Sequence, residues 1–280
     1  MSDDALAQGI ARRDLFDLDG CIAVVTGAAS GLGHAIAAGL ASYGAHVVGG
    51  DINEAGLEAT VQRIRSAGGT AIGVRCDVSD EASVDAMFAR ADAEYGHVDI
   101  LVNDAYAPLT RLVPEAYELD AWERSIRVNL TGYFLCARAA GRRMIERGQG
   151  GSIVNISSVA GSSGMGRGNF AYSVSKHGVI GLTRELAVEW AKYRIRVNAI
   201  QPCQFLTPGL RAWIDAEPDP QSVMQNLLRG IPLDRLGDPE RDIVGPIVFL
   251  VSRAAAMVTG VVLPVDGGNL AFNAGGSKSW

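Results

Sequence analysis

The sequence predicts an α/β fold, a single doubly wound domain in which helices cover both faces of a parallel, seven-stranded sheet. Short apolar segments alternate with helical patterns along almost the whole chain, as repeated β-α units require. These segments are apolar throughout rather than at every second position, which is typical of parallel strands buried on both faces. No internal repeat, low-complexity linker or change in composition divides residues 1–280, so we expect one domain.

The segments that predict the strands are short, apolar and rich in β-branched residues: residues 21–26, 45–49, 70–75, 98–103, 152–156, 194–200 and 261–265. Apolar residues at helical spacing predict helices over residues 32–43, 54–67, 79–94, 122–147, 170–192 and 239–251. Gly44 is a typical helix stop, and Ser79, Asp80 and Glu81 suit the start of the third helix.

The stretch from residue 203 to residue 238 interrupts this rhythm. It is rich in Pro, with Leu, Trp and Met between charged residues. A long insertion late in such a fold is often a lid over the site, and we interpret it so; a helical excursion on the surface is the alternative. Residues 1–14 are expected to be an N-terminal extension. Residues 271–280 form a Gly-rich tail that either reaches a neighbouring subunit or has no fixed structure.

Composition excludes several classes of function. The formal net charge of −6 repels phosphate backbones, so we expect no nucleic-acid partner. The start of the chain is polar and acidic, unlike a signal peptide, and no apolar stretch approaches the roughly 20 residues that span a bilayer. None of the cysteines forms a Cys-x-x-Cys pair, which indicates free thiols in a reducing compartment. We therefore expect a cytoplasmic protein without a membrane partner.

A glycine-rich turn follows the first predicted strand. Gly27, Gly31 and Gly33 stand between that strand and a helix, where glycine allows a sharp turn and a helix N-terminus attracts a pyrophosphate. Asp51 follows the second predicted strand, in the place where a carboxylate accepts hydrogen bonds from the adenosine ribose. Its charge would repel a 2′-phosphate, so the pattern favours NAD over NADP. A tight turn without a ligand is the alternative.

A tyrosine and a lysine provide the candidate chemistry. Tyr172 and Lys176 lie four residues apart, on one face of the predicted helix. A free phenol has a pKa of about 10, and a cation within about 4–6 Å lowers it. We therefore expect Lys176 to lower the pKa of Tyr172, which then accepts the proton of an alcohol as hydride leaves. Two serines end the strand before this helix, and we favour Ser158 over Ser157 for orienting the substrate oxygen; a capping serine is the alternative.

Together these residues resemble the short-chain dehydrogenase/reductase family, classical subtype, over residues 15–268. The matching segments are the turn at 26–33, Cys76-Asp77-Val78, Val128-Asn129, Asn155-Ile-Ser-Ser158, Tyr172-Ser-Val-Ser-Lys176, Arg196-Val-Asn-Ala-Ile-Gln-Pro202 and the Thr259-Gly and Val265-Asp-Gly-Gly268 segments. The resemblance supports the expectation of a Rossmann-type domain.

The resemblance also implies roles for individual residues. Asn129, Ser158, Tyr172 and Lys176 would be catalytic, with Asn129 holding a water in a proton relay; alternatively Asn129 bonds backbone at a helix kink. The expected cofactor-binding residues are Gly27, Ser30, Gly31, Leu32, Gly33, Asp51, Ile52, Asp77, Val78, Asn103, Ala105, Tyr172, Lys176, Pro202 and Thr207. Substrate contacts are expected from Tyr106, Ser158 and Trp213, and no metal site is expected. The subtype forms homotetramers through its two longest helices and last strand, so a homotetramer or homodimer is expected here.

Two segments depart from the family pattern. Residues 103–106 read Asn-Asp-Ala-Tyr where the family has Asn-Asn-Ala-Gly. Tyr106 either points into the substrate cleft or changes how the nicotinamide ribose is held. Cys203 replaces a glycine after Pro202 and is not expected to be catalytic, because nothing in its context lowers a thiol pKa.

The expected function is an NAD-dependent oxidoreductase that interconverts a secondary alcohol and a ketone. Residues 15–20 resemble family members that act on sugar acids, polyols and other hydroxy compounds. Trp213 and Arg211, with other apolar residues of the 203–238 stretch, suit a substrate that is part apolar and part acidic, although Trp213 equally suits packing. A non-catalytic NAD-binding sensor or partner subunit is the alternative, and a lyase or epimerase that uses bound NAD transiently is a third.

Overall fold

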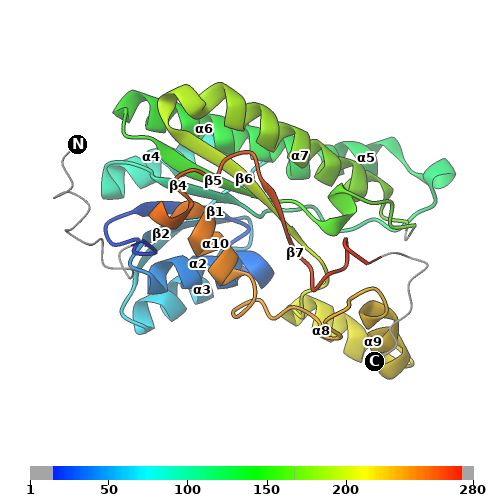
Figure 1. Cartoon of the computed structure of the whole chain (residues 1–280). Coiled ribbons are helices and arrows are strands. Elements are labelled where there is room, and N and C mark those ends of the chain that lie inside the picture. Colours follow the sequence, from blue (N-terminus) through cyan, green and yellow to red (C-terminus); the bar gives the residue numbers. More distant parts are fainter. Residues whose placement is uncertain (1–14, 167, 273–280) are drawn as a thin grey trace, which may run out of the picture.

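The computed structural model describes residues 15–166 and 168–272. Its centre is a parallel sheet of seven strands in the order β3-β2-β1-β4-β5-β6-β7, as the sequence predicts (Figure 1). The strands are β1 (Ile22–Thr26), β2 (His46–Asp51), β3 (Thr70–Arg75), β4 (Ile100–Asn103), β5 (Gly151–Ile156), β6 (Ile195–Pro202) and β7 (Val262–Val265). The predicted extension 1–14 and most of the tail 271–280 lie outside the described residues, and the single domain stays a prediction.

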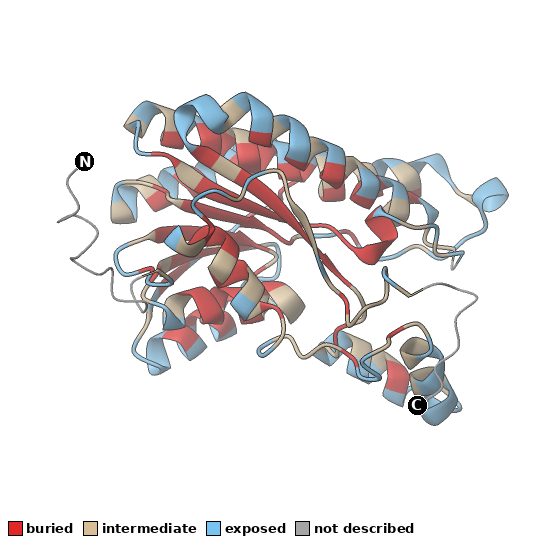
Figure 2. Cartoon of the chain, in the orientation of Figure 1, coloured by how far each residue is buried: buried red, intermediate tan, exposed pale blue. Residues whose placement is uncertain are grey.

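Helices cover both faces of this sheet. The helices are α2 (Gly31–Ser42), α3 (Glu54–Ser66), α4 (Glu81–Tyr95), α5 (Leu119–Ile126), α6 (Gly132–Arg147), α7 (Phe170–Trp190), α8 (Pro208–Asp215), α9 (Pro220–Leu228) and α10 (Val244–Val251). Helices α2, α3 and α10 pack with the sheet into one apolar core, and α4, α6 and α7 into the other (Figure 1). Figure 2 shows the strands and the inward helix faces buried, with the exposed residues on the outer helix faces. Hydrophobic burial on both sides of the strands therefore holds the layers together.

Strand register brings the functional segments to one edge. Thr26 pairs with Asn103, and Asn103 with Asn155, so β1, β4 and β5 end side by side. Successive strands are added in one direction from β1 to β3 and in the other from β4 to β7, so the strand order reverses between β1 and β4, the place where open α/β sheets bind ligands. We call the side of the sheet where the strands end the carboxyl edge. The turns that follow β1, β4 and β5 all lie on it.

Three predicted helix boundaries are wrong for local reasons. The helix expected over 122–147 is two helices, α5 and α6, separated by a π-helical turn over Arg127–Thr131. The third helix begins after Asp80, whose carboxylate caps the Ser83 N–H, because Ser79 is bound to Asp77 instead. The last helix begins at Val244 rather than residue 239, since the Asp238 carboxylate holds residues 238–242 in a turn.

Short single-turn segments complete the chain. They are the 3-10 segments η1 (Pro114–Ala116), η3 (Val159–Gly161), η4 (Ala191–Tyr193) and η5 (Arg253–Ala255), and the π-helical η2 (Arg127–Thr131). The predicted helix over 170–192 therefore ends at Trp190 and continues as η4. Other predicted ends differ from the observed ones by one or two residues, which is the usual uncertainty at element ends.

The 203–238 segment packs around a small apolar cluster of its own. It holds helices α8 and α9, and Ile214, Ile231 and Leu236 form the cluster's buried centre. The two ends of the segment are joined, because the Leu206 N–H donates to the Gly237 carbonyl at 2.7 Å. In Figure 1 α8 and α9 project beyond the carboxyl edge, away from the helices that cover the sheet. This arrangement fits a lid, and the lid itself stays a prediction.

Candidate active site

The glycine turn after β1 forms a cradle that side chains would fill. Gly27 and Gly31 have φ of +74° and +57°, the left-handed region that favours glycine. A Cβ on Gly33 would lie 2.2 Å from the carbonyl oxygen of Gly27, and a Cβ on Gly27 would lie 2.8 Å from the Ala105 nitrogen. Backbone therefore packs on backbone here, with Ser30 capping α2 without using its own hydroxyl. The turn fits a pyrophosphate, which unpaired N–H groups at a helix N-terminus attract.

Asp51 is held in place at the end of β2. Its carboxylate accepts the Ala29 N–H at 3.0 Å and the Asn53 N–H at 2.9 Å. These bonds fix the side chain between the glycine turn and the start of α3, where a ribose diol of an adenosine would meet it. Ile52 beside it is 63% exposed. Sequence analysis missed Arg75, which is paired with Asp51 in the β2–β3 register and forms an ion pair with Glu54 at 3.6 Å.

The remaining expected cofactor residues lie along the same edge. Asp77 follows β3, and its carboxylate accepts the N–H and hydroxyl of Ser79. Val78 is buried against Gly132. Asn103 is buried at the end of β4, where its amide donates to the Asn155 side chain at 2.9 Å. The N–H of Ala105 donates to the Thr26 hydroxyl, which ties the turn after β4 to the turn after β1.

On the other side of the turn lie residues that follow β6. Thr207 caps α8 through the Leu210 N–H, and its methyl group would lie 3.6 Å from a Cβ placed on Gly31. Pro202 is buried at the end of β6, and Leu32 packs into the core below the turn. The structure thus brings the 203–238 segment against the glycine turn, as expected for residues that contact a dinucleotide.

Ser158 and Tyr172 are brought together next to Lys176. Ser158 follows β5, and its side chain lies close enough to the Tyr172 phenol, in the first turn of α7, to lower the pKa of that phenol. Ser157 is different: its hydroxyl donates to the Lys176 carbonyl at 2.9 Å and so fixes β5 to α7. The Lys176 ammonium nitrogen lies 5.6 Å from the centre of the Tyr172 ring. This geometry favours Ser158 over Ser157 as the residue that faces a substrate.

The expected direction of the Tyr172 pKa is wrong for this arrangement. Burial raises the pKa of Tyr172 to about 12; the Ser158 side chain lowers it, and the charges of Tyr106 and Asp104 raise it further. Lys176 is not among the groups that lower the pKa of Tyr172, and its ammonium donates elsewhere. It donates to the Ile156 carbonyl at 2.6 Å and to the Tyr133 hydroxyl at 3.1 Å. The phenol is therefore a proton donor in this state of the protein.

Lys176 shares its buried site with a carboxylate that sequence analysis did not single out as a site residue. Burial lowers the pKa of Lys176, and the nearby Asp104 carboxylate opposes that change. Burial raises the pKa of Asp104 to about 7, while Lys176 and the Gly33 N–H lower it. The Tyr133 ring centre lies 4.8 Å from the Lys176 nitrogen. A signal for Asp104 existed in the departure from the family's Asn, whereas nothing local marked Tyr133.

Asn129 is fully buried in the π-helical turn η2. Its side-chain oxygen accepts the Ala107 N–H at 2.7 Å, and its amide donates to the hydroxyls of Ser125 and Ser175. The side chain therefore joins α5, α7 and the loop after β4, which agrees with the alternative of a residue that bonds backbone at a kink. Its catalytic role stays a prediction.

Tyr106 lies in the loop after β4 and Trp213 in α8, so the two expected substrate residues come from different elements. Tyr106 is 60% exposed, yet close enough to Tyr172 for its charge to affect the pKa of that residue. Trp213 belongs to α8 and packs against the small cluster of the 203–238 segment. Its ring also receives the guanidinium carbon of Arg111 at 5.1 Å. Trp213 thus both packs and meets a cation from the loop after β4, a contact that sequence analysis missed.

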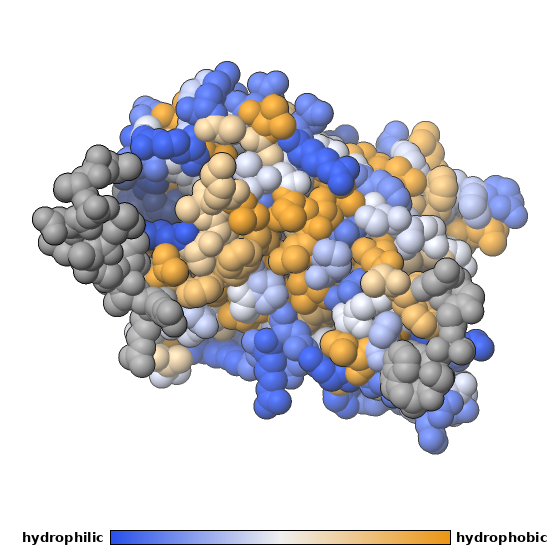
Figure 3. Space-filling view, in the orientation of Figure 1, coloured by the Kyte–Doolittle hydropathy of each residue, from blue (hydrophilic) through white to orange (hydrophobic). Residues whose placement is uncertain are grey.

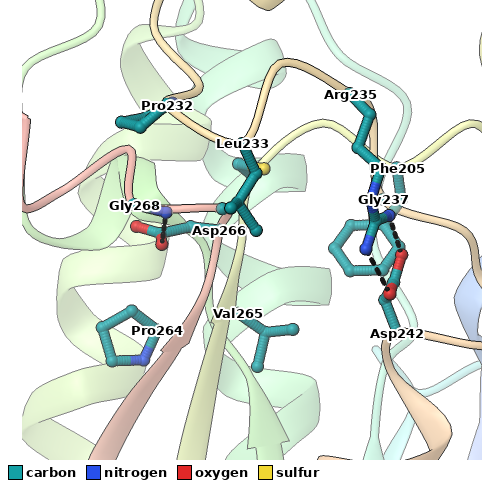
Figure 4. A pocket seen from close by; sticks show the side chains of 12 residues that line it. Phe205, Pro232, Leu233, Arg235, Gly237, Asp242, Pro264, Val265, Asp266 and Gly268 are labelled. Atoms are coloured by element: carbon teal, nitrogen blue, oxygen red, sulfur yellow. Dashed lines mark hydrogen bonds and ion pairs between the residues drawn. The ribbon is translucent and has the colours of Figure 1, made fainter.

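Two hollows lie apart from this group. One, of about 520 Å³, lies between the base of the 203–238 segment and the end of β7 (Figure 4). Phe205, Asp266 and the Arg235–Asp242 ion pair line it, together with Cys203, whose pKa burial raises to about 11. The second, of about 520 Å³, lies on the other side of that ion pair. Neither contains Ser158, Tyr172 or Lys176, and the raised pKa makes Cys203 a poor nucleophile.

Metal and membrane features are absent from the part of the chain that the structure describes. Residues 15–166 and 168–272 contain no group of His, Cys, Asp or Glu side chains arranged to hold a metal ion. Within the same residues, no helix has both the length and the apolar character needed to cross a bilayer.

Comparison with known proteins gives consistent matches. A family model described as enoyl-(acyl carrier protein) reductase matches residues 27–269. The chain is 42% identical over 255 residues to a D-threitol dehydrogenase of Mycolicibacterium smegmatis, covering 90% of this chain and 94% of that protein. It is 44% identical over 249 residues to a cis-4-hydroxycyclohexanecarboxylate dehydrogenase of Sinomonas cyclohexanicum, covering 88% and 95%. A crystal structure from Beutenbergia cavernae, named as an NAD(P)-dependent gluconate 5-dehydrogenase with NADP at low occupancy, matches with TM-score 0.83, 39% identity and coverage of 92% and 100%.

Proposed function

The chain belongs to the short-chain dehydrogenase/reductase family, and we propose that it is an NAD-dependent dehydrogenase that interconverts a secondary alcohol and a ketone. That it is an oxidoreductase of CH–OH groups follows from its relatives. The observation that carries the finer proposal is the group of Ser158, Tyr172 and Lys176 at the carboxyl edge, beside the glycine cradle.

Relatives support a hydroxylated, non-aromatic substrate. Their names specify a four-carbon polyol, a hydroxylated cyclohexane carboxylate and a sugar acid. These compounds share a secondary hydroxyl, and they divide into neutral and anionic members. We propose a substrate of this class, which agrees with the expectation of a sugar acid, polyol or other hydroxy compound.

The proposed cofactor is NAD, held along the carboxyl edge. The glycine turn with Ser30 would hold the pyrophosphate, Asp51 the adenosine ribose, and Asp77 and Val78 the adenine. A nicotinamide accepts the hydride when bound. The Asp51 carboxylate, fixed by two backbone N–H groups, opposes a 2′-phosphate and supports NAD. Arg75, opposite Asp51, works in the other direction, and its solvent-exposed ion pair with Glu54 at 3.6 Å offsets this only in part. A relative with bound NADP makes direct comparison of both cofactors necessary.

The mechanism assigns the proton to Tyr172. In alcohol oxidation the Tyr172 oxygen takes the hydroxyl proton, and in ketone reduction it donates that proton. Ser158, close enough to the phenol to lower its pKa, orients the substrate oxygen. Lys176, whose nitrogen lies 5.6 Å from the centre of the Tyr172 ring, would release one of its own protons to a water held by Asn129 as it receives the proton from Tyr172, which completes a relay to solvent. Because the pKa of Tyr172 lies above neutral, oxidation is expected to speed up as pH rises.

Tyr172→Phe tests this proposal. The variant keeps the ring and loses the proton carrier, so kcat should fall at least ~100-fold. The assay is a panel of hydroxy acids and polyols read by NADH formation, with NADP in parallel. Binding of NADH should change far less than kcat, and Tyr95→Phe on α4, away from the site, should keep full activity. Near-parent turnover by Tyr172→Phe would refute the mechanism, and faster turnover with NADP would refute the cofactor proposal.

One observation favours a second candidate function. The pKa of Tyr172 is raised, and Lys176 donates to Tyr133 and the Ile156 carbonyl instead of acting on the phenol. A non-catalytic NAD-binding sensor or partner subunit would need no activated phenol. NADH binding without turnover of any compound in the panel would support this candidate against the first.

We also propose that the protein works in the cytoplasm as a homotetramer or homodimer. All four cysteines are free in the structure, which suits a reducing compartment. Apolar side chains exposed on α6 and α7 support assembly of identical chains.

A further inference from the structure

We propose that Arg111 binds a carboxylate of the substrate, so that the hydroxy compound of the proposed function is a hydroxy acid rather than a neutral polyol. The inference rests on the proposed function for the identity of the reacting group, but not for the binding itself. It comes from a contact between the loop after β4 and helix α8: the guanidinium carbon of Arg111 lies 5.1 Å from the centre of the Trp213 ring.

Arg111 is anchored close to the reacting phenol. It belongs to the loop between β4 and α5, and its neighbour Leu112 forms a bridge with Asn169 through the Gly168 carbonyl, at 3.2 Å. Asn169 directly precedes α7, and Tyr172 lies in the first turn of that helix. Earlier in the same loop, Tyr106 is close enough to raise the pKa of Tyr172. The loop therefore lies beside the start of α7, the part of that helix that carries Tyr172.

Trp213 approaches Arg111 from helix α8, which belongs to a different part of the chain than the loop of Arg111. Helix α8 begins at Thr207, which lies against Gly31 of the glycine turn. Trp213 itself is half-buried among the apolar side chains of the 203–238 segment. A guanidinium that lies over an indole ring can still donate hydrogen bonds through the N–H groups in its own plane. The contact with Trp213 therefore orients Arg111 and leaves its hydrogen-bond donors available.

The charge of Arg111 has no counterion in the described structure. Among residues 15–166 and 168–272, the ion pairs use Arg63, Arg75, Arg90, Arg138, Arg143, Arg147 and Arg235, all with carboxylates of this chain. Arg111 is absent from these pairs. An arginine held in place without a carboxylate is suited to bind one in a planar, two-bond geometry.

The surroundings of Arg111 strengthen this attraction. Tyr106, Leu109, Leu112 and Val113 are exposed in the same loop, between 36% and 60% of their surface. An apolar substrate body covered by these side chains would exclude water from the ion pair, and charges attract more strongly where water is excluded. The expected substrate thus has a secondary hydroxyl at Tyr172, an apolar or weakly polar body, and a carboxylate at Arg111.

Arg211 offers a matched comparison. It is the arginine that the sequence suggested for an acidic substrate, and it belongs to α8 as Trp213 does. In the structure it lines the hollow beside the Arg235–Asp242 ion pair instead. The two arginines therefore share exposure and charge but differ in position, so their substitution separates a specific subsite from a general electrostatic effect.

The test compares binding of two non-reacting probes, cyclohexanecarboxylate and cyclohexanecarboxamide, to the full chain by titration calorimetry with NADH present. The parent should bind the carboxylate roughly 10- to 100-fold more tightly than the amide, since a hydrogen-bonded ion pair is lost in the amide. Arg111→Gln should bring the two affinities together without changing amide binding. Arg111→Lys should keep part of the preference, and Arg211→Gln all of it.

Equal binding of both probes by the parent, or a preference that survives Arg111→Gln, would overturn the inference. Loss of the preference in Arg211→Gln but not Arg111→Gln would overturn it as well. The readout needs no turnover, so it separates this inference from the proposed function. Carboxylate preference that depends on Arg111, in a protein that oxidises neither hydroxy acids nor polyols, would support the subsite and contradict the proposed oxidation.

Discussion

Asp104 is a buried carboxylate between the glycine turn and the candidate catalytic lysine. Its side chain is 8% exposed and accepts the Gly33 N–H. Burial disfavours the charged form, while Lys176 and that N–H favour it, and the balance leaves its pKa at about 7. Charge at this position therefore changes in the pH range where a dehydrogenase works.

Asp104→Asn should change how stability depends on pH. In the folded protein the pKa of Asp104 is about 7, above its ordinary value of 3.8, so the folded state holds the proton more tightly than the unfolded chain. The contribution of the protonated Asp104 carboxyl to the free energy of unfolding is therefore complete below pH about 4, and it is lost as the pH rises through about 7. Asn cannot titrate, so between these values the variant should gain about 1–3 kcal/mol relative to the parent.

Urea unfolding at several pH values and a fixed protein concentration measures this difference. Asp85→Asn, an exposed carboxylate on α4, is the control and should follow the parent at every pH. A constant difference between Asp104→Asn and the parent from pH 4 to 7 would contradict the prediction.

The sequence was sufficient to predict which residues come together at the carboxyl edge, but not which hydrogen bonds and ring contacts their side chains make there. The glycine turn, Asp51 and the choice of Ser158 depend on short segments, and the structure brings them to one edge. The direction of the Lys176 side chain depends on Tyr133 and on the end of β5, both distant in sequence. The Arg111–Trp213 contact likewise joins two loops whose relative placement no local pattern specifies.

At the scale of elements, the β1–turn–α2 unit determines whether a dinucleotide fits. A Cβ on Gly33 would lie 2.2 Å from the Gly27 carbonyl oxygen and 2.9 Å from the Asp104 carboxylate. Neither neighbour can move without changing the turn or the buried carboxylate. Gly33→Ala should therefore destabilise the protein by about 1–3 kcal/mol and weaken NADH binding more than tenfold, since it displaces the helix from the strand.

Chemical unfolding and NADH fluorescence titration test this prediction. Gly245→Ala in α10 is the matched control, because no atom lies within 4 Å of the added Cβ. A helix favours Ala over Gly, so this control should be neutral or up to ~1 kcal/mol more stable. Parent-like NADH affinity in Gly33→Ala would show that the turn does not hold the cofactor.

Element types could be predicted from the sequence more fully than their interruptions. The predicted strands and their parallel arrangement are confirmed, because continuous apolar segments can be buried only between two helical layers. The π-helical turn at Arg127–Thr131 was not predicted: its residues keep the helical pattern on both sides. Asn129 occupies it because the loop after β4 supplies the Ala107 N–H, a tertiary contact.

At the scale of the molecule, residues 15–166 and 168–272 leave two apolar surfaces without cover from one another. β7 is the last strand of the sheet, and its residues are only partly buried. Figure 3 shows hydrophobic side chains gathered in the middle of the face where β7 lies. The outer face of α7 is the second surface, with Val174 and Val188 exposed at 38% and 78%. Apolar area of this kind is characteristic of surfaces that meet another chain.

The α7 surface has the geometry of a helix–helix contact. Val174, Gly181 and Val188 are seven residues apart, so they form one line along the helix. No atom lies within 4 Å of a Cβ placed on Gly181, which leaves room for a second helix to approach closely.

Val188→Glu should therefore weaken self-association at least ~10-fold, because a two-fold axis would bring charged side chains onto an apolar seam. Sedimentation velocity should show a tetramer or dimer for the parent and smaller species for the variant. Tyr43→Glu, partly exposed at the end of α2, should sediment like the parent. A monomeric parent, or a Val188→Glu variant that assembles like it, would rule out this surface as the interface.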